Sequence, residues 1–461
     1  MRRLFGTDGI RGIANKTLTA DLAYKVGLAT AKLLMTNHFR DTEYSPFGDT
    51  KPVVLIGTDT RPSKDMIVSS VTSGLTAGGV NVVHIGILPT PAIAYLTKLY
   101  SFASIGIMIT ASHNPKEYNG IKIIGADGYK LPDQLEEQIE DFISKINPST
   151  IANYYAEDCG KTKTDLASTA ANDYISNLLK FSLKPLRVAI DCSNGSASSC
   201  ISIFKKVGLS FSAYNLDMSG EHINENCGSM HLEFLQNVIK NSVIPFDCGI
   251  AFDGDADRCL LVDEAGEIVD GDHILAIVGG YLKEHRLLTN NLIVGTVMAN
   301  LGLVKFCEAK GIKFLSTKVG DKYVLEEMLT NNGSLGGEQS GHIIFKEMAT
   351  TGDGILTALM VLNIMDKTGK KLSELKNQIF KYPQVSTQIT ATPDQKNAFI
   401  ANNTLRQKIN DMVFSVLGHD GRSVVRPSGT ENYIRIMVEG KDYDTITKLC
   451  DDIQKLIIQQ L

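Results

Sequence analysis

Short apolar runs that alternate with helix-like stretches constrain the fold of this chain more than any other feature of its first 125 residues. Runs at 53–56, 80–85 and 105–109 are typical of buried strands. Between them, apolar residues recur at helical spacing, in one helix that Thr19 caps and in a second that carries Ile67, Val71 and Leu75. Strands that alternate with helices predict a mainly parallel sheet, and such sheets bind ligands at the carboxyl ends of their strands.

The loop at residues 110–115, with the sequence TASHNP, directly follows the last of these runs. Asn114 and Pro115 force the chain to turn, which places the hydroxyl of Ser112 at the carboxyl edge of the sheet. For this hexapeptide alone, an ordinary Asn-Pro surface turn fits equally well. Further along, Lys122 is expected on the returning strand, and the alternative is a lysine that simply faces solvent.

The chain is long enough for about three or four domains, each with its own core. The strand and helix pattern restarts at 186–191, after a polar stretch at 147–163, and again at 292–297. These three segments, of roughly a hundred residues each, suggest a repeated architecture without a clear repeat of residues. The C-terminal part differs, with strands expected at 424–425 and 433–438 and a closing helix, so it predicts a smaller α+β domain.

Composition excludes several classes of function. A net charge of −5 leaves no positive surplus for a polyanion, so nucleic acid is not an expected partner. No apolar segment resembles a signal peptide or is long enough to cross a bilayer, and we therefore expect a cytoplasmic protein without a membrane partner. Its eight cysteines form no C-x-x-C pair and no zinc-type spacing, which indicates reduced, structural thiols.

Three aspartates, Asp253, Asp255 and Asp257, follow an apolar run at 249–252. Carboxylates at alternate positions can converge on one hard cation, and three of them suit Mg²⁺. An EF-hand calcium loop is rejected because Arg258 occupies the sixth position, where that loop needs glycine, and because strands flank the segment. An acidic turn that only faces solvent remains an alternative for the loop taken alone.

Three further loops offer groups that bind sugars or phosphate. At residues 5–12, three glycines would let the backbone approach a ligand, while Arg11 presents a guanidinium fork to phosphate. At 336–341, Glu338 and Ser340 lie two residues apart between glycines, a spacing suited to neighbouring sugar hydroxyls, although a plain turn fits equally well. The third loop, at 426–431, can enclose a phosphate with a guanidinium, hydroxyls and backbone amides. Its predicted ligands are Arg426, Ser428, Gly429 and Thr430.

The serine loop, the aspartate loop, the loop at 336–342 and the loop at 426–431 resemble, in this order, the motifs of the α-D-phosphohexomutase superfamily across essentially the whole chain. The resemblance implies an α/β fold of four domains around a central cleft, in which three related α/β domains with mixed sheets precede the smaller α+β domain. We place these domains at 1–155 with the serine loop, 165–262 with the metal loop, 263–375 with the sugar loop and 380–461 with the phosphate loop.

Within the superfamily, the loops at 5–12, 336–342 and 426–431 are most similar to the branch that acts on glucosamine phosphates. Asn432 departs from that branch, where proline is usual, and Thr110 and Tyr118 resemble the phosphomannomutase/phosphoglucomutase branch. These departures leave a hexose phosphate as the alternative substrate.

The resemblance implies interconversion of glucosamine 6-phosphate and glucosamine 1-phosphate through a phosphorylated Ser112 and a 1,6-bisphosphate, which would serve amino-sugar nucleotide and cell-wall precursor synthesis. One Mg²⁺ per active site, held by Ser112 and the three aspartates, would offset the charge of the phosphoserine. Lys122 and Arg11 are the candidate catalytic groups for the proton and the transferring charge, and His342 is expected to contact substrate or to assist. A hexose 1,6-bisphosphate or a kinase would prime Ser112, and we expect a homodimer.

Two interpretations of a different class stay open. A metal-dependent sugar phosphatase would use the same acids and phosphate-binding groups but would release phosphate to water. A non-catalytic sugar-phosphate-binding protein would be expected to lack Ser112 or one of the aspartates, and in this sequence all of them are present.

Overall fold

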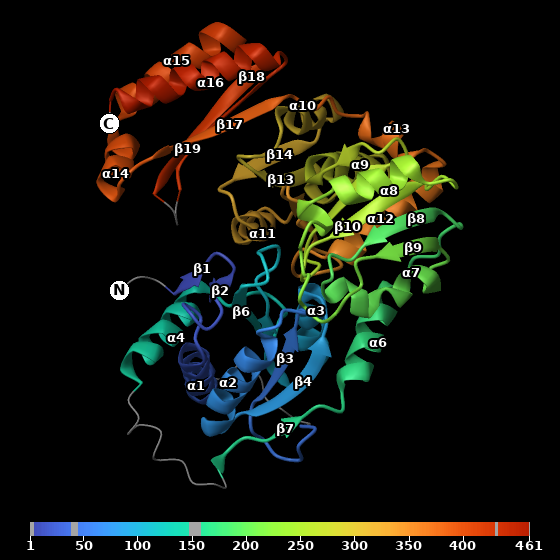
Figure 1. Cartoon of the computed structure of the whole chain (residues 1–461), viewed down its shortest axis with the longest axis vertical. Coiled ribbons are helices and arrows are strands. Elements are labelled where there is room, and N and C mark those ends of the chain that lie inside the picture. Colours follow the sequence, from blue (N-terminus) through green and yellow to red (C-terminus); the bar gives the residue numbers. More distant parts are fainter. Residues whose placement is uncertain (1–3, 38–44, 147–157, 429–431, 461) are drawn as a thin grey trace.

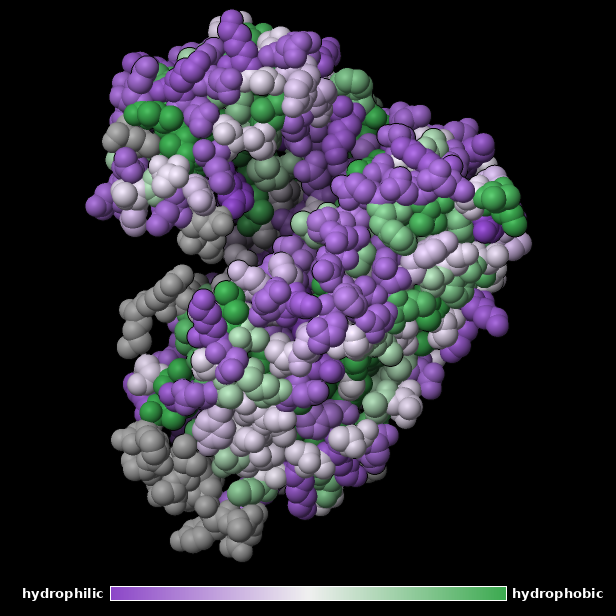
Figure 2. Space-filling view, viewed as in Figure 1, coloured by the Kyte–Doolittle hydropathy of each residue, from purple (hydrophilic) through white to green (hydrophobic). Residues whose placement is uncertain are grey.

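The computed structural model describes residues 4–37, 45–146, 158–428 and 432–460 of the 461-residue chain. Four sheets follow one another along the sequence, and together they give the molecule a curved outline (Figure 1). The first domain and the C-terminal domain form the two ends of the curve, with the second and third domains between them. A deep recess separates the two ends (Figure 2). The predicted architecture of four domains around a cleft is thus confirmed.

The first sheet has seven strands in the order β1-β2-β6-β5-β3-β4-β7. Its strands are β1 (Phe5–Gly6), β2 (Gly9–Ile13), β3 (Val53–Thr58), β4 (Asn81–Ile87), β5 (Ala103–Ile109), β6 (Tyr118–Gly125) and β7 (Thr162–Lys163). Its helices are α1 (Ala20–Thr36), α2 (Lys64–Ala77), α3 (Thr90–Leu99) and α4 (Asp133–Lys145). β3 pairs in parallel with β4 and β5, as the alternation predicts, whereas β6 returns antiparallel to β5 and makes the sheet mixed.

Local sequence explains the elements of this domain. Every residue of β3 and of β5 is buried, as expected for strands that are covered on both faces. α1 begins where the Thr19 hydroxyl accepts a hydrogen bond of 3.1 Å from the backbone N–H of Leu22. Its buried face includes Val26, Ala29 and Leu33, which confirms the predicted apolar stripe.

The second and third domains repeat this layering with smaller sheets, in the orders β12-β11-β10-β8-β9 and β14-β13-β15-β16. Their strands are β8 (Arg187–Asp191), β9 (Ser210–Tyr214), β10 (Cys248–Phe252), β11 (Cys259–Asp263), β12 (Ile268–Val269), β13 (Leu292–Thr296), β14 (Lys313–Thr317), β15 (Leu335–Gly337) and β16 (Ile343–Phe345). Their helices are α6 (Ala167–Leu178), α7 (Ser202–Lys206), α8 (Glu233–Asn241), α9 (Gly271–Glu284), α10 (Leu301–Lys310), α11 (Asp321–Thr330), α12 (Gly354–Thr368) and α13 (Leu372–Lys376). The two predicted restarts of the pattern are β8 and β13. Our domain boundaries remain predictions, and the second sheet extends to Val269, beyond residue 262 where we place the end of that domain.

The C-terminal domain is a three-stranded antiparallel sheet in the order β17-β19-β18 with its own apolar core. Its strands are β17 (Gln384–Thr390), β18 (Gly421–Pro427) and β19 (Tyr433–Gly440), and its helices are α14 (Pro393–Ala401), α15 (Asn403–Leu417) and α16 (Tyr443–Ile458). The two predicted strands and the closing helix are therefore confirmed.

The cysteines are free thiols, as the sequence indicates. All eight cysteines are free, and all except Cys159 are buried. Among the helices within the described ranges, none has the length and apolar character that a bilayer crossing requires.

Candidate active site

Ser112 lies just after β5, where the first domain meets the second. Its side chain is fully buried, and its backbone adopts the left-handed conformation, with φ of 54°. The Ser112 Oγ donates a hydrogen bond of 2.6 Å to the Asp253 Oδ2 in the second domain. His113 Nδ1 lies 3.3 Å from the same Oγ, and burial lowers the pKa of His113 to about 3, so its ring stays neutral at pH 7. The serine hydroxyl is therefore aimed at a carboxylate, and the interpretation as a plain surface turn is wrong.

The three aspartates occupy the turn between β10 and β11, which pair as an antiparallel hairpin. Asp253, Asp255 and Asp257 are all buried, and one oxygen atom of each lies within 4.8 Å of the others. Ala256 takes a positive φ of 51°, which bends the turn so that alternate side chains converge. This arrangement contradicts the alternative of a solvated acidic turn.

The aspartate oxygens fit a bound cation. Asp255 Oδ1 and Asp257 Oδ1 are buried, and neither has a hydrogen-bond partner among the described residues. The other Asp255 oxygen accepts hydrogen bonds from Thr90 Oγ1 at 2.5 Å and from Lys122 Nζ at 2.8 Å. Because an unpaired buried carboxylate oxygen is costly, two such atoms beside Asp253 mark a place where a hard divalent cation would supply the missing partner.

The pKa values of Asp253 and Asp257 are shifted in opposite directions. Burial, together with repulsion from Asp257 and Asp255, raises the pKa of Asp253 well above its ordinary value. Burial acts in the same direction on Asp257, but Lys122, His342 and Arg258 outweigh it and hold the pKa of Asp257 well below its ordinary value. Two carboxyl groups of one short turn thus differ in how readily they hold a proton.

Lys122 is on β6 and is only 2% exposed, so the alternative of a solvated lysine is wrong. Its Nζ lies 2.8 Å from Asp255 Oδ2, 2.9 Å from Asp8 Oδ2 and 3.3 Å from Asp257 Oδ2. Burial acts to lower the pKa of Lys122, but these three carboxylates raise it well above its ordinary value. A lysine that stays protonated is suited to stabilising transferred negative charge rather than to accepting a proton.

Arg11 projects from β2 and forms an ion pair with Asp8, which also binds Lys122 and Lys130. The loop at 5–12 therefore reaches the aspartate centre through Asp8, while the predicted contact of Arg11 with phosphate stays a prediction. Gly9, however, has a positive φ of 81°, and a Cβ there would lie 2.4 Å from the carbonyl oxygen of Ile121. At Gly9 the close approach is to the neighbouring strand β6 and not to a ligand.

The turn between β15 and β16 carries Glu338 and Ser340, and the charge of Glu338 acts on Arg258 beside the aspartates. Glu338 Oε1 accepts a hydrogen bond of 3.0 Å from the backbone N–H of Gly320. His342 is only 3% exposed, with Nδ1 3.7 Å from Asp257 and Nε2 3.6 Å from Asp321. Of the two roles predicted for His342, these contacts favour assistance through Asp257, while its contact with substrate remains a prediction.

Several charged residues of this centre were not among the predicted site residues. Arg258 is close to Asp257, with 3.8 Å between its Nε and the Asp257 Oδ1, and Lys130 joins Asp8 to Asp321 of the third domain. Arg258 directly follows the aspartate motif, so its position was available as a signal. Lys130 and Asp321 are far apart in the sequence, and no local pattern connects them.

The predicted phosphate loop is placed apart from this centre. Arg426 is on β18, directly opposite Arg435 on β19, and burial together with the charge of Arg435 lowers the pKa of Arg426. Two guanidinium groups side by side favour an anion between them, and Arg435 was missed because its strand lies outside the motif. The backbone N–H of Ser428 donates to the Tyr433 carbonyl at 2.8 Å. The other two predicted ligands, Gly429 and Thr430, lie outside the described residues.

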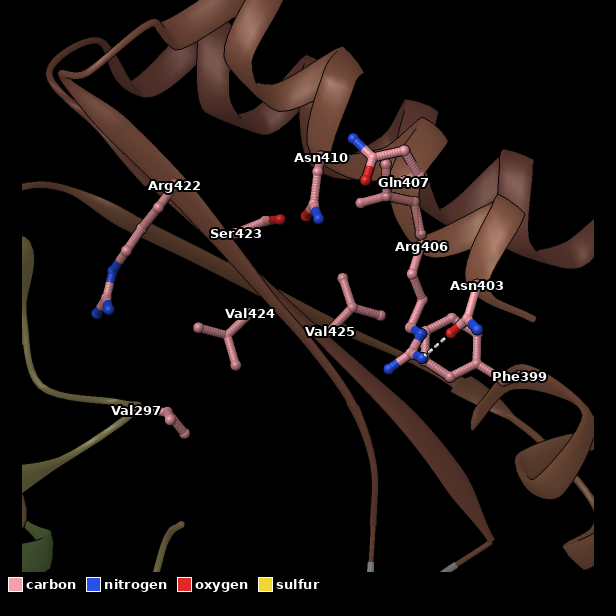
Figure 3. Close-up of a pocket in the computed structure, with 11 residues that line it drawn as sticks. Val297, Phe399, Asn403, Arg406, Gln407, Asn410, Arg422, Ser423, Val424 and Val425 are labelled. Carbon is pink, nitrogen blue, oxygen red and sulfur yellow. Dashed lines mark hydrogen bonds between the residues drawn. The ribbon is translucent and has the colours of Figure 1, made fainter. Parts of the chain in front are cut away.

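A pocket lined mainly by the C-terminal domain, with Val297 of the third domain at its edge, contains none of the predicted site residues. Figure 3 shows that β18 contributes residues 422–425 and that α15 contributes Asn403, Arg406, Gln407 and Asn410. Arg406 is hydrogen-bonded to Asn403 within the pocket (Figure 3). This pocket therefore offers no further support for the predicted site.

Comparisons with known proteins agree with this geometry. The chain matches the four models of the phosphoglucomutase/phosphomannomutase family: α/β/α domain I at residues 2–150, domain II at 170–266, domain III at 270–382 and the C-terminal domain at 389–456. The phosphoglucosamine mutase of Thermoanaerobacter pseudethanolicus is 45% identical over 100% of both chains. The phosphoglucosamine mutase of Caldanaerobacter subterraneus is 46% identical, also over 100% of both chains.

Solved structures share the fold. A phosphoglucomutase/phosphomannomutase family protein of Burkholderia thailandensis matches with a TM-score of 0.78 and 24% identity, over 100% of this chain and 98% of its own. Aspergillus fumigatus N-acetylphosphoglucosamine mutase, in complex with GlcNAc-6P and magnesium, matches with a TM-score of 0.65 and 16% identity, over 99% and 96% of the two chains. Because the four family domains follow in order along the chain and the relatives match its full length, this protein belongs to the phosphoglucomutase/phosphomannomutase family of α-D-phosphohexomutases.

Proposed function

We propose that this chain is a phosphoglucosamine mutase, which interconverts glucosamine 6-phosphate and glucosamine 1-phosphate. The observation that carries the proposal is the hydrogen bond of 2.6 Å between the Ser112 Oγ and Asp253, because it places a buried nucleophile against a carboxylate cluster. The choice of glucosamine as the sugar is supported by relatives of that name that match the whole chain at 45–46% identity.

Ser112 is the proposed phosphoryl carrier. A phosphoryl group leaves the Ser112 Oγ and bonds to O1 of glucosamine 6-phosphate, which gives a 1,6-bisphosphate. The bisphosphate turns over in the cleft, its 6-phosphoryl group returns to the Ser112 Oγ, and glucosamine 1-phosphate is released. The number of phosphate groups on enzyme and sugar together stays constant through the cycle.

One Mg²⁺, held by Asp253, Asp255, Asp257 and Ser112, is the proposed cofactor. When bound, it offsets the charge of the phosphoserine and of the phosphoryl group in transfer. The residues of the chain supply the rest of the electrostatic stabilisation, since Lys122 is held against the aspartates by ion pairs of 2.8 and 3.3 Å. Arg11 and Arg258 are the further cations of this centre.

Substrate binding is assigned to two loops. Glu338 and Ser340 would bind hydroxyls near the middle of the sugar, and His342 would hold Asp257 and assist them. In the C-terminal domain, Arg426, Ser428, Gly429 and Thr430 would bind the phosphate that is not transferred. Arg435 lies opposite Arg426 and adds a second cation to this site.

The partners of the enzyme follow from this chemistry. Its substrate is a phosphorylated hexosamine, and a hexose 1,6-bisphosphate or a kinase would place the first phosphate on Ser112. A cytoplasmic homodimer is the form that we propose.

The test is a comparison of three substrates, each incubated with the purified phosphorylated protein and Mg²⁺. We expect turnover of glucosamine 6-phosphate to exceed that of mannose 6-phosphate and glucose 6-phosphate, without release of inorganic phosphate. Preference for mannose or glucose would instead assign the chain to the phosphomannomutase/phosphoglucomutase branch. Stoichiometric release of phosphate would identify a phosphatase.

A further inference from the structure

The carbonyl groups of the serine loop converge on a single buried arginine. Arg61 follows β3 and is fully buried. Its Nη2 donates to the Ser112 carbonyl at 2.8 Å and to the Asn114 carbonyl at 2.7 Å. Its Nη1 donates to the Tyr118 carbonyl at 2.9 Å and to the Pro115 carbonyl. Arg61 thus joins the start of the loop to its end.

The fifth N–H of the guanidinium is also used. Arg61 Nε donates to Asp59 Oδ2 at 2.9 Å, and the same oxygen accepts from Thr110 Oγ1 at 2.6 Å. Thr110 Oγ1 in turn accepts from the backbone N–H of Ser112 at 2.9 Å. Every N–H that an arginine side chain can donate is therefore directed at the serine loop or at the carboxylate beside it.

A residue of the second domain binds two of the same four carbonyls. Asn224 Nδ2 donates to the Ser112 carbonyl at 2.9 Å and to the Asn114 carbonyl at 3.1 Å. Gly254, within the aspartate turn, closes the remaining space, because a Cβ there would lie 2.7 Å from the Ser112 carbonyl oxygen and 3.0 Å from Asn224 Nδ2. The Ser112 carbonyl therefore lies in a slot formed by Arg61, Asn224 and Gly254.

We propose that Arg61 and Asn224 are positioning residues for phosphoryl transfer. They hold the backbone carbonyl of Ser112, and this orients the Ser112 hydroxyl toward the aspartate centre. The inference rests on the proposed function and goes beyond it, because among the described residues neither side chain hydrogen-bonds to the Ser112 Oγ, to the aspartates of the metal loop or to the loop at 336–342. Ser112 has a φ of 54°, a conformation that an L-residue adopts only when its surroundings hold it there. The hydrogen bonds that Arg61 and Asn224 donate to the Ser112 carbonyl supply that restraint.

The two residues divide this task between the domains. Arg61 shapes the loop within the first domain, whereas Asn224 sets the loop in register with the second domain, which carries the aspartates. A misplacement of roughly 1 Å between the reacting groups costs about a hundredfold in rate, so loss of Asn224 should act on the chemical step more than on substrate binding.

The decisive variant is Asn224→Gly, with Asn226→Gly as its matched control. Both asparagines lie in the same loop with positive φ, 59° and 52°, where glycine is tolerated, so neither change strains the backbone. Among the described residues, the Asn226 side chain makes no hydrogen bond to the serine loop. We expect Asn224→Gly to lower kcat roughly tenfold to a hundredfold while KM for each monophosphate stays within about twofold. The kinetics of Asn226→Gly should match those of the parent protein.

Arg61→Lys tests the hydrogen bonds from Arg61 to the carbonyls of the serine loop. It retains the positive charge, but one ammonium group cannot replace the fork that binds four carbonyls, so its loss of kcat should exceed that of Asn224→Gly. Thermal unfolding shows whether either variant is destabilised, and if Arg61→Lys does not fold, Asn224→Gly still decides. Phosphorus NMR of the phosphorylated proteins gives a readout without turnover, in which the phosphoserine resonance of Asn224→Gly should differ from that of Asn226→Gly.

The outcomes separate this inference from the proposed function. If the parent protein interconverts neither glucosamine phosphate, the proposed function fails. If the parent protein is active and Asn224→Gly matches Asn226→Gly in kcat and in its phosphoserine resonance, the positioning role is wrong and the function stands. An increase in KM with kcat unchanged would also overturn the positioning role.

Discussion

The serine centre, which comprises Ser112, Lys122 and the three aspartates, differs from the predicted phosphate loop of the C-terminal domain in how it is built. At the serine centre, buried side chains from different domains are joined directly, as Ser112 is to Asp253 and Lys122 is to Asp255. At the phosphate loop, Arg426 is partly exposed on a strand of one domain, and no hydrogen bond between described residues joins that domain to the serine loop. The proposed groups for transfer are thus placed by the packing of the first domain against the second, whereas the proposed phosphate loop depends on how the C-terminal domain is attached.

That attachment runs through the third domain. Glu439 is fully buried, accepts a hydrogen bond of 3.0 Å from the backbone N–H of Leu301 and pairs with Arg422. Asn300 Nδ2 donates to the Tyr382 carbonyl at 2.9 Å, in the segment that connects the two domains. The position of Arg426 relative to Ser112 therefore depends on polar contacts between the third domain and the C-terminal domain.

The largest expected effect is at the serine centre. Ser112→Ala should reduce mutase turnover by at least about a thousandfold while the protein still folds, because the change removes the phosphoryl carrier and little else. Intact mass should show one phosphate on the parent protein and none on the variant. Full activity of the alanine protein would rule out a covalent mechanism.

Asp255→Asn should weaken Mg²⁺ binding and transfer together, since one charged ligand is lost and the phosphoserine is only partly neutralised. We expect the half-saturating Mg²⁺ concentration to rise roughly tenfold to a hundredfold. This concentration is obtained by measuring the reaction rate at increasing Mg²⁺ concentrations. The control is Glu233→Gln, which changes an exposed acid on α8. Unchanged metal dependence would show that the aspartates hold no catalytic cation.

Arg426→Ala tests the predicted phosphate loop of the C-terminal domain. In the proposed mechanism only Ser112 performs transfer, so both monophosphates would present their untransferred phosphate to one loop and would bind in reversed orientations. Loss of the guanidinium should weaken binding of both by about 1.5–3 kcal/mol, as expected for a hydrogen bond to a charged group.

Binding must be measured on the inactive Ser112→Ala protein, with and without Arg426→Ala, for each monophosphate separately. Catalytic efficiencies cannot decide this question, because the fixed equilibrium constant makes the forward and reverse values fall together in any variant. Arg406→Ala, in the same domain, is the control for loss of a guanidinium. If only one monophosphate binds more weakly, the loop serves a single orientation.

The last prediction concerns stability, not activity, where the C-terminal domain is attached to the third domain. Asp272 is fully buried beside Asn300, whose backbone N–H donates to it at 3.0 Å, and burial raises the pKa of Asp272 to about 7. A carboxyl group with a raised folded-state pKa stabilises the fold fully below the unfolded-state pKa near 4, and this contribution is lost as pH rises through about 7. The stability of the parent protein relative to Asp272→Asn should therefore fall between pH 5 and pH 8. Chemical unfolding of both proteins measures this difference, and a difference independent of pH would contradict the raised pKa.

The sequence by itself determined the elements and the loops that carry chemistry. The burial of β5, the cap at Thr19 and the turn after Ser112 were predictable because hydrophobic period, capping and turn preference act over a few neighbouring residues. The convergence of the three aspartates was predictable for the same reason, since alternate positions of one short turn lie close together.

Only the tertiary structure decided which of these loops meet and what holds them. Ser112 and Asp253 are 141 residues apart, and Lys122 and Asp255 are 133 apart, so their contacts depend on how whole domains pack. The same packing buried His342 between two carboxylates and brought Arg61 and Asn224 to the Ser112 carbonyl, although no motif marks either residue. Such contacts depend on three-dimensional complementarity between domain surfaces. The residue pattern of one strand or loop therefore does not indicate which distant residues will contact it.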